Sequence, residues 1–232
     1  MIQANCRERF TAEDFDFVVR TLARSESDSV NLVSLLTDAE ALDSILDHPQ
    51  LVHSILEHGA PLTISPQCYF YILIRHVLKE TGLNHRGLSD YLASLLERFS
   101  QTARMRSPAD GNSNPVQYVS DMLIALRNAS PSQSFLIRAH VGNYSLFITG
   151  MFHDTVQSRS LRGAPDVSYY EDMGRSSFKA VARHQLARSC ALTGIFDALA
   201  EEFHEVRLAL NRLSDSLIHL GDDPAPPHAL LP

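Results

Sequence analysis

The chain has 232 residues, of which 44% are hydrophobic and 20% are charged. This length and composition are sufficient to bury a hydrophobic core, so they exclude disorder as the default state. The chain contains 20 Lys and Arg against 27 Asp and Glu, which gives a formal charge of −7. The acidic balance argues against a general nucleic-acid-binding protein, because such a protein needs a basic surface.

The three cysteines, Cys6, Cys68 and Cys190, are far apart and odd in number. They predict neither a disulfide framework nor a cysteine zinc site, and they favour a reducing compartment. Residues 1–10 contain no apolar run of the kind found in a secretory signal. No segment approaches the ~20 consecutive apolar residues of a membrane helix. We therefore expect a cytoplasmic protein that does not enter a membrane.

Four short helices are predicted near the N-terminus. Thr11 caps the first, Asp14 follows three residues later as in a capping box, and apolar residues recur at helical spacing up to Leu22. The other three are expected over residues 30–36, 39–46 and 51–56. The N-terminal part should therefore be a succession of small helices.

Residues 67–81 are predicted to form a central helix. Ser65 and Pro66 provide a cap and a first-turn proline, and Gly82 provides an end. The middle of this segment is apolar on every side, which is typical of a helix buried among others. A further helix is expected over residues 88–99.

Helical patterns continue through the second half of the chain. One helix is expected over residues 115–130, and the apolar segment 135–152 carries regularly spaced small side chains that indicate a tightly packed interior helix. Asp166 or Ser168 can cap a helix that begins near Tyr169.

The C-terminal segment has the clearest periodicity. Apolar residues from Leu192 to Leu220 alternate steps of four and three, which is a heptad seam. The positions beside the seam are mostly small or apolar, and this favours a bundle core or a tight antiparallel partner over an exposed zipper. We therefore expect one long heptad-patterned C-terminal helix.

The predicted fold class is all-α, a multi-helix bundle of about nine or ten helices, because no strand pattern and no repeat is found. The expected organisation is an N-terminal helical part over residues 1–106, a loop over 107–114, a C-terminal bundle part over 115–221 and a disordered tail over 222–232. The two helical parts can also form a single domain.

The sequence lacks the glycine-rich phosphate loops, the zinc helix and the nucleophile elbow of common enzymes, and no cofactor is expected. Glu201 and His204 are weak metal-ligand candidates, because their spacing matches half of a di-iron bundle site. A complete site needs a second such pair, which is not found. A solvated helix face is therefore the favoured interpretation of these two residues.

The ligand-binding candidates are His140, Asn143, Tyr144, Tyr169, Tyr170 and Arg175. The first three are three and four residues apart on an otherwise apolar helix, where polar groups need partners. One hypothesis is a pocket for a small anionic or aromatic ligand, with tyrosine walls and Arg175 as the counter-charge. The other, which we favour, is a structural hydrogen-bond network between two core helices.

Four segments resemble a known family. They read SPQCYFYILIRHVLKETGL followed by LSDYLASLLERF, and VGNYSLFITGMF followed by VSYYEDMGRSSF. Together they are similar to a family of bacterial all-helical proteins that are found as open reading frames. The resemblance extends over most of the chain. It implies a bacterial, cytoplasmic, helical protein. The family brings no established activity, so the resemblance assigns no catalytic residue.

The function favoured by these observations is a helical interaction protein that forms a homodimer or binds a protein partner, because a heptad seam is present and catalytic motifs are absent. The first alternative is a small-molecule-binding domain that uses the region from His140 to Arg175. A metal-dependent enzyme of unrecognised type is the second. No nucleic-acid or membrane partner is expected.

Overall fold

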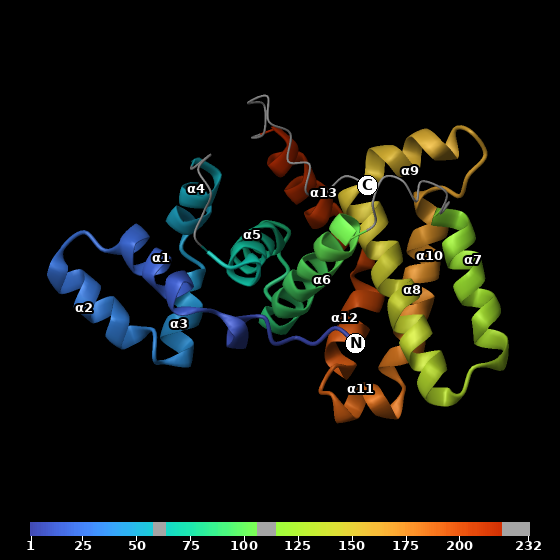
Figure 1. Cartoon of the computed structure of the whole chain (residues 1–232), viewed down its shortest axis with the longest axis horizontal. Helices are drawn as coiled ribbons and strands as arrows, with labels where there is room; N and C mark the ends of the chain where they lie inside the picture. Colours follow the sequence, from blue (N-terminus) through green and yellow to red (C-terminus); the bar gives the residue numbers. More distant parts are fainter. Residues whose placement is uncertain (58–63, 106–114, 220–232) are drawn as a thin grey trace.

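The computed structural model describes residues 1–57, 64–105 and 115–219 (Figure 1). Within those residues it contains thirteen α-helices, two short 3-10 helices and no strand, which confirms the all-α class. The 3-10 helices are η1 (Arg7–Arg9) and η3 (Leu126–Asn128). The α-helices are α1 (Ala12–Leu22), α2 (Glu26–Leu35), α3 (Ala39–Leu46), α4 (Pro49–Glu57), α5 (Pro66–Glu80), α6 (Arg86–Met105), α7 (Pro115–Ala125), α8 (Pro131–Met151), α9 (His153–Ser160), α10 (Val167–Ala182), α11 (Gln185–Ser189), α12 (Thr193–Glu201) and α13 (Phe203–His219).

The predicted count of nine or ten helices is too low. The helix α9 is mostly polar and α11 has only 5 residues, so neither carries an apolar period long enough to be recognised. The third cause lies at the C-terminus, where the single predicted helix is divided into α12 and α13.

Helix ends follow the predicted caps closely. Thr11 and Asp14 form the capping box of α1, in which the Asp14 carboxylate accepts from the Thr11 backbone N–H at 2.8 Å. The Ser65 hydroxyl accepts from the Cys68 N–H at the start of α5, and Gly82 follows the helix with φ +83°, a conformation that favours glycine. Asp166 caps α10 by accepting from the Tyr169 N–H.

The helix α5 lies at the centre of the molecule, as its all-round apolar sequence predicts (Figure 1). Residues from Phe70 to Ile74 are all buried, and α5 packs against α4, α6 and α13. Ile2 and Cys6 are also buried in the same core, because the N-terminal segment contacts α5 through η1. One core cluster therefore includes residues from both sides of residues 107–114, extending from Ile2 to Leu213.

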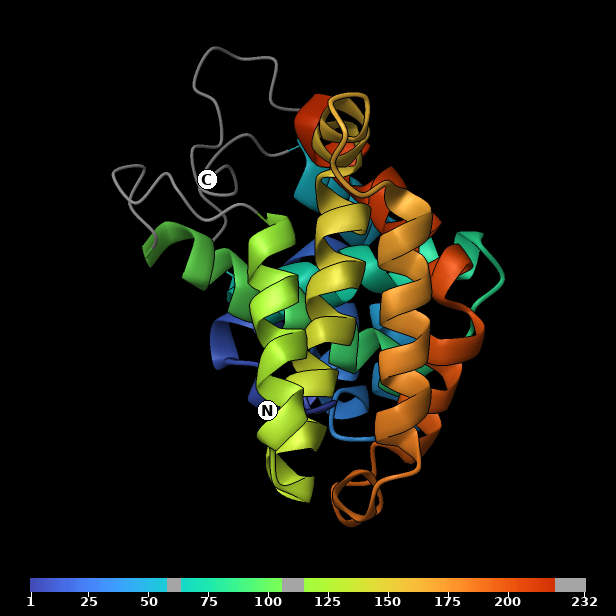
Figure 2. The same ribbon diagram turned by 90° about the vertical axis from the view of Figure 1, so that its right-hand side faces the viewer.

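The second interior helix is α8, which lies between α7 and α10 (Figure 2). Small residues permit this close packing. A Cβ on Gly142 would lie 2.8 Å from a ring carbon of Phe178, and one on Gly150 would lie 2.7 Å from Leu210 Cβ. The stripe of small side chains thus brings α8 within reach of both α10 and α13.

The prediction of one long C-terminal helix is wrong, because the chain breaks at Glu202. This residue has φ −104° and ψ 22°, and it separates α12 from α13. The seam residues from Leu192 to Leu213 are nevertheless all buried. The heptad pattern therefore predicts correctly which residues are buried, but not that the helix is interrupted. The two helices pack against different neighbours: α12 packs on α10 and α6, whereas α13 packs on α8 and α5. Leu220, the last predicted seam residue, lies outside the described residues.

The break is stabilised by contacts specific to α13. The ring of Phe203 occupies the space beside Gly174, where a Cβ would lie 2.3 Å from a ring carbon. Asn211 donates from Nδ2 to the carbonyl oxygens of Thr149 and Gly150 at 2.8 and 2.7 Å, and thereby satisfies two carbonyl groups at the C-terminal end of α8. The break thus allows Phe203 to pack beside Gly174 of α10 and Asn211 to bind the end of α8.

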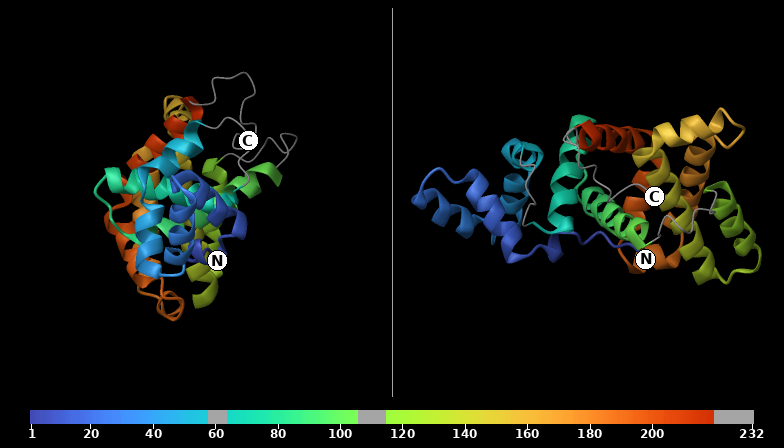
Figure 3. Two further views of the ribbon diagram at one scale, coloured as in Figure 1. Left: turned by 90° about the vertical axis from the view of Figure 1, so that its left-hand side faces the viewer. Right: turned by 45° about the horizontal axis from the view of Figure 1, so that its top comes forward.

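The helices α1 to α4, residues 12–57, form an N-terminal arm that extends away from the rest of the molecule (Figures 1 and 3). The arm packs on the molecule mainly where α4 meets α5, and α2 lies at its outer edge. We call α5 to α13 the body. The predicted loop over residues 107–114 and the tail over 222–232 lie outside the described residues.

No helix of the described residues is both long and apolar enough to cross a bilayer.

Candidate functional site

Asn143 takes part in a hydrogen bond between two core helices. Its side-chain oxygen accepts from the Tyr91 hydroxyl of α6 at 2.9 Å, and both residues are buried. Burial raises the pKa of Tyr91, so the phenol keeps its proton and remains a donor. His140, one turn earlier, stacks on the Phe99 ring of α6 with 5.8 Å between ring centroids. These two candidates therefore face α6, not α10.

The three tyrosines among the candidates come together in a small second cluster. Tyr170 is buried there with Val119, and Tyr144 and Tyr169 pack against it. Tyr169 and Tyr170 meet edge to face with 5.4 Å between ring centroids. Arg175 is exposed on α10. The three tyrosines of the hypothetical pocket thus lie together, whereas Asn143 faces α6. Ligand binding at the tyrosines stays a prediction.

Glu201 and His204 lie on opposite sides of the break between α12 and α13. His204 contacts Glu171 of α10, with 3.1 Å between Nδ1 and Oε1, and the Arg207 guanidinium donates to the same carboxylate oxygen. Glu201 is exposed. Across residues 1–57, 64–105 and 115–219, no three His, Cys, Asp or Glu side chains are arranged to hold a metal ion.

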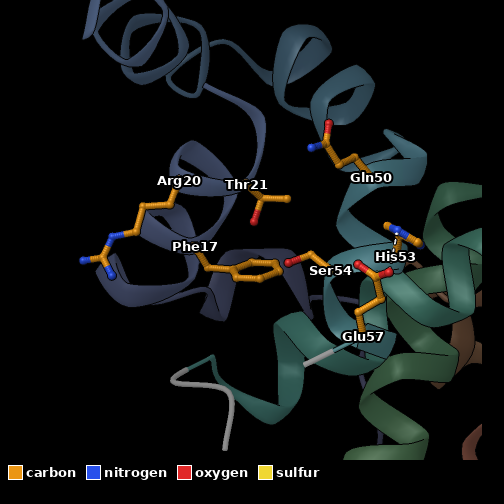
Figure 4. Close-up of a pocket in the computed structure, with 7 residues that line it drawn as sticks. All are labelled: Phe17, Arg20, Thr21, Gln50, His53, Ser54 and Glu57. Atoms are coloured by element: carbon orange, nitrogen blue, oxygen red, sulfur yellow. Dashed lines mark ion pairs between the residues drawn. The ribbon is translucent and has the colours of Figure 1, made fainter. Parts of the chain in front are cut away.

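A hollow of about 400 Å³ lies between α1 and α4 (Figure 4). Its lining residues are Phe17, Arg20, Thr21, Gln50, His53, Ser54 and Glu57. The His53 and Glu57 side chains pair at 3.0 Å but are 67% and 61% exposed, and Arg20 points away from the other lining residues (Figure 4). A ligand site is normally a mostly buried apolar pocket into which a few polar groups point. This hollow lacks that arrangement.

A cluster of alternating charges joins the arm to the body. We call it the joint cluster; its members are Arg7, Asp43, Asp47, Arg75, Lys79, Arg86 and Asp90. Asp43 and Asp47 belong to α3 and its C-cap, whereas Arg75 and Arg86 belong to α5 and α6. The ion pairs therefore run between elements that are far apart in sequence.

Arg75 is the most buried member of the joint cluster. Its side chain is 2% exposed, and Nε donates to Asp47 Oδ1 at 2.7 Å. Burial acts to raise the pKa of Asp47, but hydrogen bonds from Arg75 and Lys79 and the charge of Arg86 outweigh it and hold the pKa below its ordinary value. Asp47 is therefore ionised throughout the neutral range.

Arg7 makes the second strong contact of the joint cluster. Its Nε and Nη2 atoms donate to Asp90 Oδ2 at 3.0 and 2.9 Å, and it also pairs with Asp43. Burial raises the pKa of Asp90 even though Arg7 acts to lower it. Because each charge of the joint cluster has a partner, we assign the cluster a structural role in fixing the arm.

A second link fixes the arm at α1. Asp14 is buried, and besides capping its own helix it accepts from the Ser65 N–H and hydroxyl, both at 2.6 Å. One carboxylate thus serves the N-terminal ends of both α1 and α5. With this link and the joint cluster, the arm is held in a defined position.

The outer helix of the arm, α2, is exposed on several sides. None of its residues is buried. Val30, Val33 and Leu35 are 67%, 56% and 47% exposed, whereas the other large exposed apolar side chains of the described residues each lie on a different element or in a segment between elements. Val30 and Val33 are one turn apart and share one side of the helix, with Leu35 farther around it. We call the surface formed by Val30 and Val33 the α2 face.

The α2 face and the joint cluster were not found by sequence analysis. The ion pairs join residues 28 to 83 positions apart, and single-sequence periodicity carries no information on such pairs. The signal for the α2 face was present: apolar residues occur all around residues 30–36, although only a few of them can face the arm.

Comparisons with protein-family models, with curated proteins and with solved structures find no match for this chain.

Proposed function

We propose that this chain is a helical interaction protein that binds a protein partner through the α2 face. The observation that carries the proposal is the exposure of Val30 and Val33, at 67% and 56%, on a helix with no buried residue. Contiguous exposed apolar side chains are typical of protein-binding surfaces, whereas isolated ones are normal.

The position of the α2 face supports the same proposal. The arm extends away from the body and places α2 at its outer edge (Figures 1 and 3). Asp14 and the joint cluster hold the arm to the body. These links anchor α1 and α3, the helices that precede and follow α2, so α2 loses less conformational entropy than a free segment when a partner binds, which favours affinity.

We place the protein in a bacterial cytoplasm. The free thiols of Cys6, Cys68 and Cys190 support this location, since a reducing compartment keeps thiols unpaired. Burial raises the pKa of Cys6 to about 12, so this thiol is unreactive at neutral pH.

The test is quantitative co-purification from cells that produce the protein. The variant carries Val30→Ser with Val33→Ser, which removes the apolar side chains but adds no charge and keeps a similar helix propensity. The control is Leu161→Ser, because Leu161 is 86% exposed but lies outside the arm. Circular dichroism and urea unfolding verify that all three proteins are folded.

We expect the double variant to lose a stoichiometric partner by at least about tenfold, since each buried valine contributes roughly 1.5 kcal/mol. The Leu161→Ser control should retain it. Equal recovery of the same proteins by all three chains, or the absence of any stoichiometric partner, would contradict the proposal.

A further inference from the structure

We infer that the partner of the α2 face is a cationic amphipathic helix of another protein. This inference rests on the proposed function and adds the chemistry of the partner. It follows from the distribution of charge over the chain, which is strongly uneven and is centred on the arm.

The whole net charge of the chain resides at its N-terminal end. Residues 1–57 contain four arginines and eleven acidic residues, a formal charge of −7, which equals that of the complete chain. The remaining residues carry 16 Lys and Arg against 16 Asp and Glu. The arm itself, residues 12–57, contains two arginines and ten acidic residues and is therefore acidic, whereas the chain after residue 57 is balanced.

The asymmetry is greatest around α2. No Lys or Arg occurs between Arg24 and Arg75, although this stretch contains seven acidic residues. Asp43 and Asp47 are neutralised by arginines of the body in the joint cluster. The helices α2 and α3 have no basic residue of their own to offset the others.

Glu26 lies beside the α2 face, on the same side of the helix. It precedes Val30 by four residues and Val33 by seven, which places all three on one side of the helix. Glu26 is exposed, as is Glu40 on α3, and within the described residues neither carboxylate makes an ion pair. The apolar surface is thus bordered by the unpaired negative charge of Glu26.

This charge pattern separates the possible occupants of the α2 face. A second copy would bring an equally acidic arm against the first, with no Lys or Arg in either α2 to offset the repulsion. Nucleic acid and anionic membrane surfaces would be repelled in the same way. A helix with apolar residues one turn apart and Lys or Arg beside them complements both the valines and Glu26.

The test uses two synthetic helical peptides of ~18 residues with leucines on one side, one with lysines and one with glutamates on the other. Binding to the full chain is measured by fluorescence anisotropy at about 50 and 300 mM salt. We expect the lysine peptide to bind at least about tenfold more tightly than the glutamate peptide, and its affinity to fall at high salt.

Two variants locate the binding. Val30→Ser with Val33→Ser should weaken the lysine peptide at least about tenfold, and Glu26→Gln with Glu40→Gln should weaken it about threefold at low salt. The control is Asp197→Asn with Glu205→Gln, which removes two exposed charges from the body and should leave the affinity unchanged.

Equal binding of both peptides, absence of binding, or binding of the lysine peptide that is insensitive to the valine substitutions would each overturn the inference. So would a dimer, seen by sedimentation, that the valine substitutions dissociate. These results leave the co-purification test untouched, so a wrong partner chemistry is distinguished from the absence of a protein-binding α2 face.

Discussion

Gly174 shows how strongly a single side chain can constrain the packing of helices. It is buried on α10, and a Cβ at this position would lie 2.3 and 2.6 Å from two ring carbons of Phe203. Phe203 is 0% exposed, so its ring would have to shift within the packed core to accommodate a Cβ at Gly174. The glycine therefore permits the close approach of α10 to the start of α13.

Gly174→Ala should lower the free energy of unfolding by about 1 to 3 kcal/mol, the usual effect of overpacking a core. The matched control is Gly194→Ala on α12, where a Cβ would meet nothing within 4 Å. That change should be neutral or raise the stability by about 0.5 kcal/mol, because alanine reduces the entropy of the unfolded chain. Urea unfolding measures both, and equal effects would contradict the packing at Gly174.

The candidate site shows what a residue pattern can and cannot predict. The buried polar character of Asn143 was correctly inferred from its apolar helix, and the structure supplies its partner, Tyr91. The identity of that partner was not accessible, because Tyr91 is 52 positions away. Local sequence indicates that a buried polar group needs a partner, whereas only the tertiary structure determines which one it finds.

At the scale of the elements, some capped helix starts and the buried faces were predictable, but the bounds of α2 and α6 and the continuity of the last helix were not. The caps at Thr11 and Ser65 were correctly assigned because capping depends on neighbouring residues. The break at Glu202 has no such local signal, since no proline or glycine stands there. It is set by tertiary contacts, among them Phe203 against α10 and Asn211 against α8.

The attachment of α3 to α5 depends on Asp47. Asp47→Asn should lower the free energy of unfolding by roughly 2 to 3 kcal/mol at pH 7, because the buried Arg75 then lacks its counter-charge. The exposed pair of Asp16 with Arg20 supplies the control. Asp16→Asn should change the stability by less than about 0.5 kcal/mol.

The effect of Asp47 should also depend on pH. The pKa of Asp47 is lower in the folded state than its ordinary value. Its contribution is therefore complete above the unfolded pKa of about 4 and is lost as the pH falls through the folded value. Urea unfolding at several pH values should show a constant difference between the wild type and Asp47→Asn from about pH 7 to 5, and a smaller one below about pH 4. A difference that grows on acidification would contradict this assignment.

For the whole molecule, composition and periodicity predicted an all-helical chain with α5 at its centre, and the structure confirms both. The projection of the arm could not be predicted, since it depends on ion pairs such as Arg75 with Asp47 and on the link from Asp14 to Ser65. The heptad seam, which suggested an interaction surface, is used inside the protein. The exposed apolar surface lies instead on α2.

The charge of the molecule is distributed unevenly between the arm and the body. The body is balanced and contains most of the core, whereas the acidic arm presents Val30 and Val33 to solvent. An exposed apolar surface bordered by charge can provide both affinity and specificity. Burial of the apolar side chains stabilises the complex, and the charge repels partners of like charge. The central claim is therefore that α2 is the part of this protein that meets another protein.

The most direct test of that claim is site-specific photo-crosslinking in cells that produce the protein. A benzophenone amino acid replaces Val33 in one variant and Leu161, an exposed apolar residue outside the arm, in the other. We predict one discrete crosslinked species from position 33, of higher mass than the chain alone, and none from position 161. The absence of a discrete product from position 33, or the same products from both positions, would contradict the account.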